Sequence, residues 1–320
     1  MFRNYDTKKF KALQAMLRPD QRVWLLTGTP CPNAPTDAWA LAKIVGSPKV
    51  PKYFGAFKRA TMMQITPFKW VPRVEGYSTA YDVMQPAVRF KKAECLDLPP
   101  VTTQDWQATT TGEQNDAFQR MKTWMQAEAS KTQITAVNAA DKINKLRQIL
   151  CGVVKDTATG SYLPLQHQGR VKVLLEAIQS ASAKVLVIVP FKGIINTLEQ
   201  ELASHYSVAV LNGDVSPSVR NKIITNFKTQ SDPHVLLCHP KVMAHGLNLT
   251  EADTLIFYAP IYSNDEFQQV TERFNRAGQT RKMTIIRIGA HPIEWAIYKM
   301  VDNKAINQDN ILNLYKTITG

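Results

Sequence analysis

Short apolar runs alternate with longer amphipathic stretches in the C-terminal half of the chain. Runs with the length of a buried strand lie at residues 185–189, 208–211, 235–238, 255–258 and 284–288. Stretches whose apolar positions recur at helical spacing lie at residues 171–179, 193–204 and 216–228. Apolar strands separated by helices are typical of a parallel sheet that is covered on both faces. We therefore predict an α/β domain with a doubly wound parallel sheet over residues 165–320.

The N-terminal half is less regular. Residues 7–17 and 36–45 predict two helices, and residues 22–26 between them predict a short buried strand. Prolines then interrupt the chain up to residue 100, and two further helices are expected at residues 112–129 and 134–150. From these patterns we divide the chain into the end of a first α/β lobe (residues 1–50), a basic and helical insert or linker (51–164) and a second lobe (165–320).

The charge balance indicates a polyanionic partner. The chain has 39 Lys and Arg against 26 Asp and Glu, a net charge of +13, and nucleic acid is the obvious polyanion for such an excess. Part of the excess lies between residues 51 and 92, interleaved with aromatic residues that could stack on bases. A solvated basic surface over aromatic core residues explains the same pattern equally well, so both interpretations stay open.

The hydrophobic content and the cysteines indicate a globular protein without a membrane span or a disulfide framework. With 44% hydrophobic and 20% charged residues, the chain resembles an ordinary globular protein, and it has no long apolar span and no apolar signal core at its N-terminus. We therefore expect a cytoplasmic protein with no membrane partner. The four cysteines, Cys31, Cys95, Cys151 and Cys238, form no CxxC pair, so we expect reduced, buried thiols and no metal site.

Two polar segments follow predicted strands. Thr27, Gly28, Thr29 and Pro30 come directly after residues 22–26, at the strand end where α/β proteins place ligands. The second segment, with His245, Gly246, Asn248 and Thr250, follows the apolar run that ends at residue 238. The first segment alone also fits a plain strand-to-helix turn, and His245 in the second also fits a residue that satisfies a backbone carbonyl.

The stretch from Ser263 to Gln279 predicts a helix with chemistry on one face. Ser263 and Glu266 form a capping box for a helix over residues 264–277, and Gly278 can end it. Gln269, Arg273 and Arg276 are spaced by four and three residues, so we expect them on one face. Such a face suits phosphate groups and can stabilise charge that develops in phosphoryl transfer, although an isolated pair of arginines more often lies on a solvated surface.

Taken in chain order, these segments resemble the Swi/Snf-type branch of the helicase-related ATPases of superfamily two. Thr27, Gly28, Thr29, Pro30 and Asn33 are similar to its third motif, and residues 185–191 to its fourth. Gly213, Arg220 and Phe227 match the segment before its fifth motif, which Gly246, Asn248 and Thr250 resemble. Gln269, Arg273, Arg276, Gly278 and Gln279 match the sixth, and residues 145–148 match its helical linker.

The resemblance implies two RecA-like lobes that hold ATP between them and move along double-stranded DNA. It implies that Arg273 and Arg276 approach the ATP phosphates, with Arg276 as the principal arginine finger and Gln269 helping to place them. It also implies that Thr27 and Thr29 link the nucleotide state to DNA contact, and that the loop with His245, Gly246, Asn248 and Thr250 contacts DNA and the lobe interface.

Some parts of the family pattern are absent from this sequence. It has no G-x-x-x-x-G-K-S/T P-loop and no Asp-Glu-x-His box, and residues 2–5 resemble the segment that follows this box. We therefore expect ATP and Mg²⁺ only in a complete two-lobe protein, with an N-terminal half supplied separately or upstream, and no ATP hydrolysis by this chain alone. His245 and residues 258–262 resemble compact bacterial and phage members, which favours a phage source. A non-catalytic DNA-binding or regulatory module and an RNA-acting relative remain as alternatives.

Overall fold

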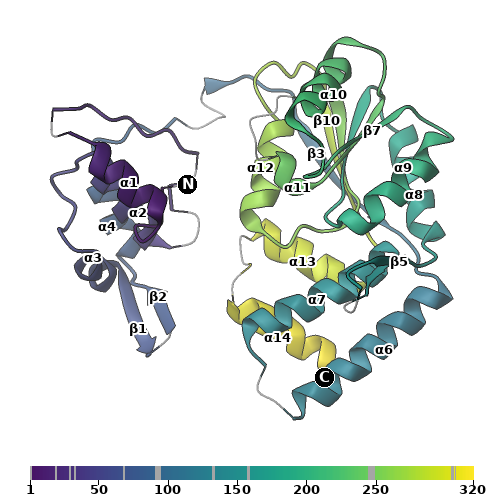
Figure 1. Cartoon of the computed structure of the whole chain (residues 1–320), viewed down its shortest axis with the longest axis horizontal. Helices are drawn as coiled ribbons and strands as arrows, with labels where there is room; N and C mark the ends of the chain where they lie inside the picture. The colour runs from purple at the N-terminus through teal and green to yellow at the C-terminus, as the bar shows by residue number, and fades with distance from the viewer. Residues whose placement is uncertain are drawn as a thin grey trace. The chain divides into compact units, whose positions relative to one another are not determined.

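A computed structural model describes residues 2–18, 20–28, 30–31, 34–67, 69–90, 95–131, 134–156, 159–243, 249–303, 306 and 308–320 (Figure 1). The chain forms two compact units, Met1–Cys95 and Leu96–Gly320, and each is described by itself. We call them the N-terminal unit and the C-terminal unit.

The described part of the C-terminal unit contains a six-stranded sheet in the order β3-β10-β9-β6-β8-β7. All neighbouring strands are parallel. The strands are β3 (Val101–Gln107), β6 (Lys184–Ile188), β7 (Val208–Leu211), β8 (Val235–Cys238), β9 (Ala252–Phe257) and β10 (Met283–Gly289). Residues 185–188 and 235–238 have no exposed surface, as expected for central strands covered on both faces. The predicted parallel α/β sheet is therefore confirmed.

Helices cover both faces of this sheet, and strand β6 shows how the core divides. Val185 and Val187 pack with α8 (Gln168–Gln179) and α9 (Lys192–Ala203) on one face. Leu186 and Ile188 pack with α10 (Pro217–Thr229), α11 (Pro240–Met243) and α12 (Asn264–Phe274) on the other. Successive side chains of a strand point to opposite faces, so one apolar run contributes to both layers.

A third core joins the two predicted middle helices to the C-terminal end of the chain. Helices α6 (Gly112–Ala129) and α7 (Ala136–Cys151) pack with α13 (Pro292–Asp302) and α14 (Gln308–Thr319) beyond one end of the sheet (Figure 1). Both middle helices therefore belong to the C-terminal unit by packing. Where the family's linker begins and ends within the predicted segment 51–164 stays a prediction.

The segment predicted as linker also contains an edge strand that sequence patterns missed. Strand β3 lies beside β10, and its residues are mostly polar and exposed. Across the pair, Arg287 Nε lies 2.6 Å from Asp105 Oδ1, and the two residues are opposite each other in the register. An edge strand of this kind lacks the apolar run that identifies central strands, so only its neighbour reveals it.

The N-terminal unit is mainly helical, with a core around Phe10, Trp39 and Phe57. Its elements are α1 (Lys8–Met16), η1 (Pro35–Asp37), α2 (Ala38–Ile44), α3 (Phe54–Thr61), β1 (Met62–Thr66), β2 (Lys69–Pro72) and α4 (Gly76–Val83), where β1 and β2 form an antiparallel hairpin. The helices predicted at residues 7–17 and 36–45 are confirmed with small shifts of their ends.

The buried strand predicted at residues 22–26 is wrong. The segment has no strand assignment, and Trp24 and Leu26 are 77% and 94% exposed, whereas Val23 and Leu25 are half-buried against the unit's core. The apolar alternation is therefore present without a hydrogen-bonded neighbour. A strand forms only where its backbone N–H and C=O groups find partners, and in the described part of this unit only β1 and β2 pair.

The four cysteines differ in their burial. The four cysteines are free thiols, but only Cys151 and Cys238 are buried, whereas Cys31 is half-buried and Cys95 is exposed. The expectation of four buried thiols is therefore wrong for two of them.

Within the described residues, no helix has both the length and the apolar character needed to cross a membrane.

Candidate functional site

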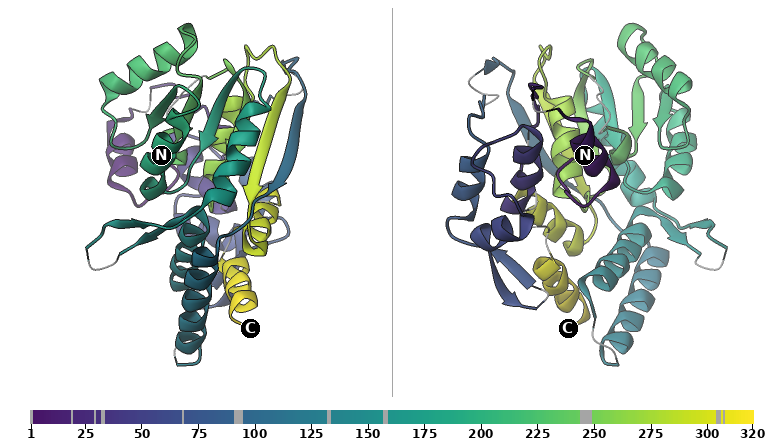
Figure 2. Two further views of the ribbon diagram at one scale, coloured as in Figure 1. Left: turned by 90° about the vertical axis from the view of Figure 1, so that its right-hand side faces the viewer. Right: turned by 60° about the vertical axis from the view of Figure 1, so that its left-hand side comes forward.

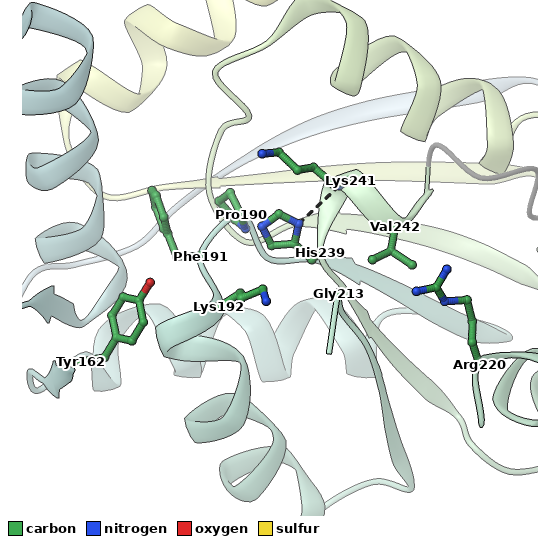
Figure 3. Close-up of a pocket in the computed structure, with 9 residues that line it drawn as sticks. All are labelled: Tyr162, Pro190, Phe191, Lys192, Gly213, Arg220, His239, Lys241 and Val242. Atoms are coloured by element: carbon green, nitrogen blue, oxygen red, sulfur yellow. Dashed lines mark hydrogen bonds between the residues drawn. The ribbon is translucent and has the colours of Figure 1, made fainter. Parts of the chain in front are cut away.

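A basic pocket lies at the carboxyl ends of three neighbouring strands in the C-terminal unit's sheet. Its volume is about 490 Å³, and it is lined by Tyr162, Pro190, Phe191, Lys192, Gly213, Arg220, His239, Lys241 and Val242 (Figure 3). Most of these residues follow the carboxyl ends of β6, β7 and β8, which are neighbours in the sheet. Parallel strands bring their following loops to one edge, and this edge is where α/β proteins bind ligands. We call this the edge pocket.

The edge pocket is electropositive. Three of its described lining residues, Lys192, Arg220 and Lys241, are cations and none is an acid. Lys192 Nζ lies 2.6 Å from Asp214 Oδ1 in an exposed ion pair that a phosphate can replace. Burial, together with the nearby Lys241 and Lys192, lowers the pKa of His239, so this ring is neutral at pH 7. The pocket therefore presents cations and a neutral imidazole to a ligand.

Helix α9 begins at this pocket. Phe191 is its N-cap and provides no side-chain acceptor, and Lys192 is the first residue of the 12-residue helix. The first-turn N–H groups of a helix and its dipole favour an anion at the N-terminus. Together with the three cations, this helix end makes the pocket suited to a phosphate group.

The helix predicted to carry phosphate-binding arginines is shorter than expected. Helix α12 begins after Ser263, whose hydroxyl accepts from the backbone N–H of Glu266 at 3.3 Å, and it ends at Phe274. Gln269 and Arg273 lie one turn apart on it, and both are half-buried. Arg276 lies beyond the helix and is exposed, so the prediction that all three share one helix face is wrong for Arg276.

The turn after α12 explains this difference. Asn275 leaves the helical conformation, and Gly278 has a φ of +97°. Gln279 is buried and donates from its side chain to the carbonyl of Ala252 at 2.9 Å, which holds the chain at the start of β9. Gly278 therefore lies in a turn four residues after the helix, and it does not end the helix itself.

The other predicted residues are only partly described. Thr27 and Gly28 are exposed in the N-terminal unit, where Arg3 Nη2 donates to Thr27 Oγ1 at 3.2 Å, and Pro30 is half-buried. In the C-terminal unit Thr250 is half-buried. The remaining predicted residues lie outside the described residues: Thr29, Asn33, His245, Gly246 and Asn248. Their proposed roles stay predictions.

A buried arginine from α7 links the edge pocket to α12. Arg147 is 2% exposed, and its guanidinium lies 5.0 Å from the ring centroid of Phe191 and 5.5 Å from that of Tyr262. It donates to the backbone carbonyl of Pro260. Phe191 lines the pocket, and Tyr262 directly precedes Ser263, the N-cap of α12. Arg147 therefore fixes two loops that carry different parts of the predicted site.

Burial shapes the chemistry of this contact. It lowers the pKa of Arg147, although nearby Cys151 and Glu294 oppose that change, and it raises the pKa of Tyr262 to about 12. A buried cation between two aromatic faces gains from the ring quadrupoles, because no water competes for it. The sequence placed Arg147 only in a linker that resembles the family's, and its contacts appear only in the folded chain.

A second buried arginine, Arg170, connects elements that lie beneath the same edge of the sheet. Arg170 and Glu294 are both fully buried, with Arg170 Nη2 2.5 Å from Glu294 Oε2. Arg170 also donates to the carbonyls of Leu150 and Tyr258, at 3.1 and 2.6 Å. It therefore joins the ends of α7 and β9 to helices α8 and α13.

The basic, aromatic segment 51–92 contributes both surface and core. Tyr53, Tyr77 and Tyr81 are each more than half exposed, whereas Phe57 is fully buried. Lys58 Nζ lies 4.1 Å from the ring centroid of Trp70. The segment therefore contains both exposed aromatic rings and a buried one, and its contact with nucleic acid stays a prediction. Phe68, Lys91 and Lys92 lie outside the described residues.

Sequence reasoning did not single out Tyr162, Lys192, His239 or Lys241. Lys192 and His239 each follow closely on an apolar run, which is a weak signal, because many loops carry polar residues there. Tyr162 comes from a short hairpin that no apolar run announces. Their grouping depends on the order of the strands in the sheet.

Comparisons with known proteins agree with this architecture. Residues 1–155 match the family model described as SNF2-related domain, and residues 169–278 match the model described as helicase conserved C-terminal domain. The uncharacterized ATP-dependent helicase MG018 of Mycoplasma genitalium is 25% identical over 82% of this chain. The chromatin-remodeling ATPase INO80 of Mus musculus is 32% identical over 36% of it. The chain spans about a quarter of the first relative's length and 8% of the second's.

Solved structures share the fold. The Sulfolobus solfataricus SWI2/SNF2 ATPase core in complex with dsDNA aligns with a TM-score of 0.52 and 21% identity, over 99% of this chain and 68% of that one. The C-terminal part of the Fun30 ATPase domain aligns with a TM-score of 0.54 and 15% identity, over 70% of this chain and 98% of that one. The two matched models therefore identify the chain as an SNF2-related portion followed by a helicase C-terminal domain, and the solved structures share the fold of that arrangement.

Proposed function

We propose that this chain is the part of a duplex-DNA translocase that contacts DNA and supplies arginines to ATP. The observation that carries this proposal is the edge pocket, where Lys192, Arg220 and Lys241 meet the N-terminus of α9. Cationic side chains and the N-terminus of a helix both bind phosphate. In a DNA backbone these groups meet the same chemistry at every nucleotide, so contact needs no particular base sequence.

The arginines after and on α12 support an ATP-facing role. The guanidinium groups of Arg273 and Arg276 form no hydrogen bond or ion pair with the part of the chain that the structure describes. Unpaired guanidiniums fit the equatorial oxygens of a transferring phosphoryl group. ATP with Mg²⁺ would supply that group in the complete two-lobe protein, while Gln269 helps to place the arginines. Thr27 and the loop with His245, Gly246 and Asn248 would connect this event to DNA contact.

The exposed segment 22–26 supports a partner lobe. Its outward residues, Trp24 and Leu26, leave apolar surface exposed on a segment that pairs with no described strand. A lobe that carries the P-loop and the acidic box would supply the neighbouring strand in the first RecA-like sheet. Sequencing the coding region upstream of Met1 tests this directly. A P-loop and an Asp-Glu-x-His box there would support the proposal, whereas ATP hydrolysis by this chain alone would contradict it.

For the DNA contact, we expect the chain to bind duplex DNA with an affinity that falls steeply with salt and depends little on sequence. Lys192→Gln and Lys241→Gln should each weaken binding about tenfold, because a charge-assisted hydrogen bond contributes about 1.5 kcal/mol. Each should also lower the slope of log Kd against log salt by about 1. Anisotropy titrations at several salt concentrations measure both quantities.

Lys316 on α14 provides the matched control, since it is exposed and lies outside the pocket lining. Lys316→Gln should leave the affinity and slope unchanged. A salt-independent affinity, or equal losses in all three variants, would contradict the placement of DNA at the edge pocket. Stronger binding to single-stranded RNA than to duplex DNA would favour an RNA-acting relative.

For the partner lobe, we expect Trp24→Asp to abolish assembly with the P-loop polypeptide. An aspartate at this position would bring a charge without a partner into the new strand interface, which costs several kcal/mol. Co-purification of the two polypeptides measures assembly. Met16→Asp, at an exposed apolar position on α1, should leave assembly intact. If both variants co-purify with the P-loop polypeptide as well as the parent chain does, segment 22–26 is not the contact.

A further inference from the structure

We propose that the edge pocket accepts one unstacked nucleotide, with its base against Tyr162 and Phe191 and its phosphate at Lys192, Arg220 and Lys241. This inference rests on the proposed DNA contact and deepens it. It names DNA with an unpaired nucleotide as the preferred substrate class, and it gives the β4–β5 hairpin a role in recognition. Strands β4 (Val153–Lys155) and β5 (Tyr162–Pro164) form this antiparallel hairpin, which projects from the C-terminal unit (Figure 2).

The ring of Tyr162 is held in place at the pocket by a glycine. A Cβ atom at Gly193 would lie 2.3 Å from Tyr162 Cδ1, so the ring occupies space that only glycine leaves open. Gly193 is in the first turn of α9, and this contact fixes the hairpin against the helix N-terminus. Tyr162 is nevertheless 40% exposed and lines the pocket. One side of the ring is therefore supported while part of it stays accessible.

The ring of Phe191 is supported by the guanidinium of Arg147. The Arg147 guanidinium lies 5.0 Å from the ring centroid, and Phe191 is half-buried and also lines the pocket. Figure 3 shows both aromatic side chains at one end of the pocket, with Arg220 at the other end. Aromatic rings that are already fixed need no ordering when a base stacks on them, which favours binding.

Charge completes the fit to a nucleotide. Cations surround the space beyond the aromatic end, and Lys155 adds another, with its Nζ 5.9 Å from the Tyr162 ring centroid. Lysine has a flexible stem, so this ammonium group can turn toward a phosphate. A site that binds only the backbone requires no aromatic wall. The pairing of two supported rings with a cationic end therefore favours a nucleotide whose base has left the duplex stack.

The test compares two duplexes of equal length, one fully paired and one with a single unpaired 2-aminopurine nucleotide. The full chain should bind the second duplex about tenfold more tightly, because one base stacked on an aromatic side chain contributes an effect of this order. The 2-aminopurine emission should change on binding, since the base exchanges stacking on neighbouring bases for stacking on a ring. Tyr162→Ala should lose both the preference and this change in emission.

Two variants separate stacking from a general effect on the hairpin. Tyr162→Phe keeps the ring and should behave as the parent. Leu163→Ala alters the next residue, which is 55% exposed and faces the other side of the strand, and should also leave both readouts unchanged.

The outcomes distinguish this inference from the proposed function. Binding to neither duplex by the parent overturns the DNA contact itself. Equal binding to both duplexes by the parent, or a preference that Tyr162→Ala retains, overturns only the nucleotide pocket. Loss of the preference in Leu163→Ala as well as in Tyr162→Ala would show that the hairpin matters through its fold, which also overturns stacking by Tyr162.

Discussion

Replacing Arg276 by alanine should lower ATP turnover at least about a thousandfold in a protein rebuilt with the P-loop lobe, as the loss of an arginine finger typically does. The expectation depends on charge that grows on the transferring phosphoryl group, which a guanidinium stabilises only if it is free to reach it. Arg276 is exposed and lies outside α12, and its guanidinium forms no hydrogen bond or ion pair with a described residue. Its removal should therefore change the free energy of unfolding by no more than about 0.5 kcal/mol.

Steady-state ATP hydrolysis in the presence of DNA measures this effect, with melting temperature and DNA affinity as the accompanying readouts. Arg281 is a matched control, because it is an exposed arginine in the same region whose Nη1 donates to the carbonyl of Glu251 at 3.4 Å. Arg281→Ala should retain turnover. Turnover within a few fold of the parent for Arg276→Ala, with collapse for Arg273→Ala, would assign the finger to the helix residue instead.

A second large effect is expected at the buried ion pair. Glu294→Ala should destabilise the C-terminal unit by about 3–5 kcal/mol, because it leaves the Arg170 guanidinium buried without its counter-charge. Burial by itself lowers the pKa of Arg170, but Glu294 outweighs that effect and raises it above the usual range. Glu294 also accepts from the backbone N–H of Ala290 at 2.8 Å, which would be lost too. Urea denaturation followed by circular dichroism measures the change.

Asp105→Ala is the comparison for this pair. Asp105 is about half exposed in its contact with Arg287 at the sheet edge, so its loss should cost about 1 kcal/mol or less. The double variant Arg170→Met/Glu294→Leu should recover much of the stability that Glu294→Ala loses, since it removes both charges. Similar losses in Glu294→Ala and Asp105→Ala would show that the buried pair contributes no more than a surface pair.

The sequence alone determined the central part of the fold. The apolar runs at residues 185–189, 208–211, 235–238, 255–258 and 284–288 all coincide with strands of the parallel sheet. Helix α6 has the bounds expected from the spacing of its apolar residues. A strand buried on both faces must be apolar throughout, and a packed helix must be apolar on one face, so these elements leave a pattern in the chain itself.

The family resemblance also came from the sequence, because its motifs combine residue types in a fixed order. The matched models cover residues 1–155 and 169–278, which include the motif segments quoted for that resemblance apart from Gln279. What the sequence pattern could not establish was the geometry of those motifs. It placed Arg276 on a helix, because spacing cannot show where Gln279 pulls the chain out of the helical path.

Only the tertiary structure decided the features that depend on a neighbour. Strand β3 is polar and exists through its pairing with β10, whereas the apolar segment 22–26 is no strand, because no described strand pairs with it. Tyr162 reaches the edge pocket because Gly193 leaves space for its ring, and Arg147 reaches Phe191 and Tyr262 across more than forty residues of chain. Contacts between residues far apart in sequence leave no periodic pattern, so the site is assembled only when strand order and close packing bring its loops to one edge.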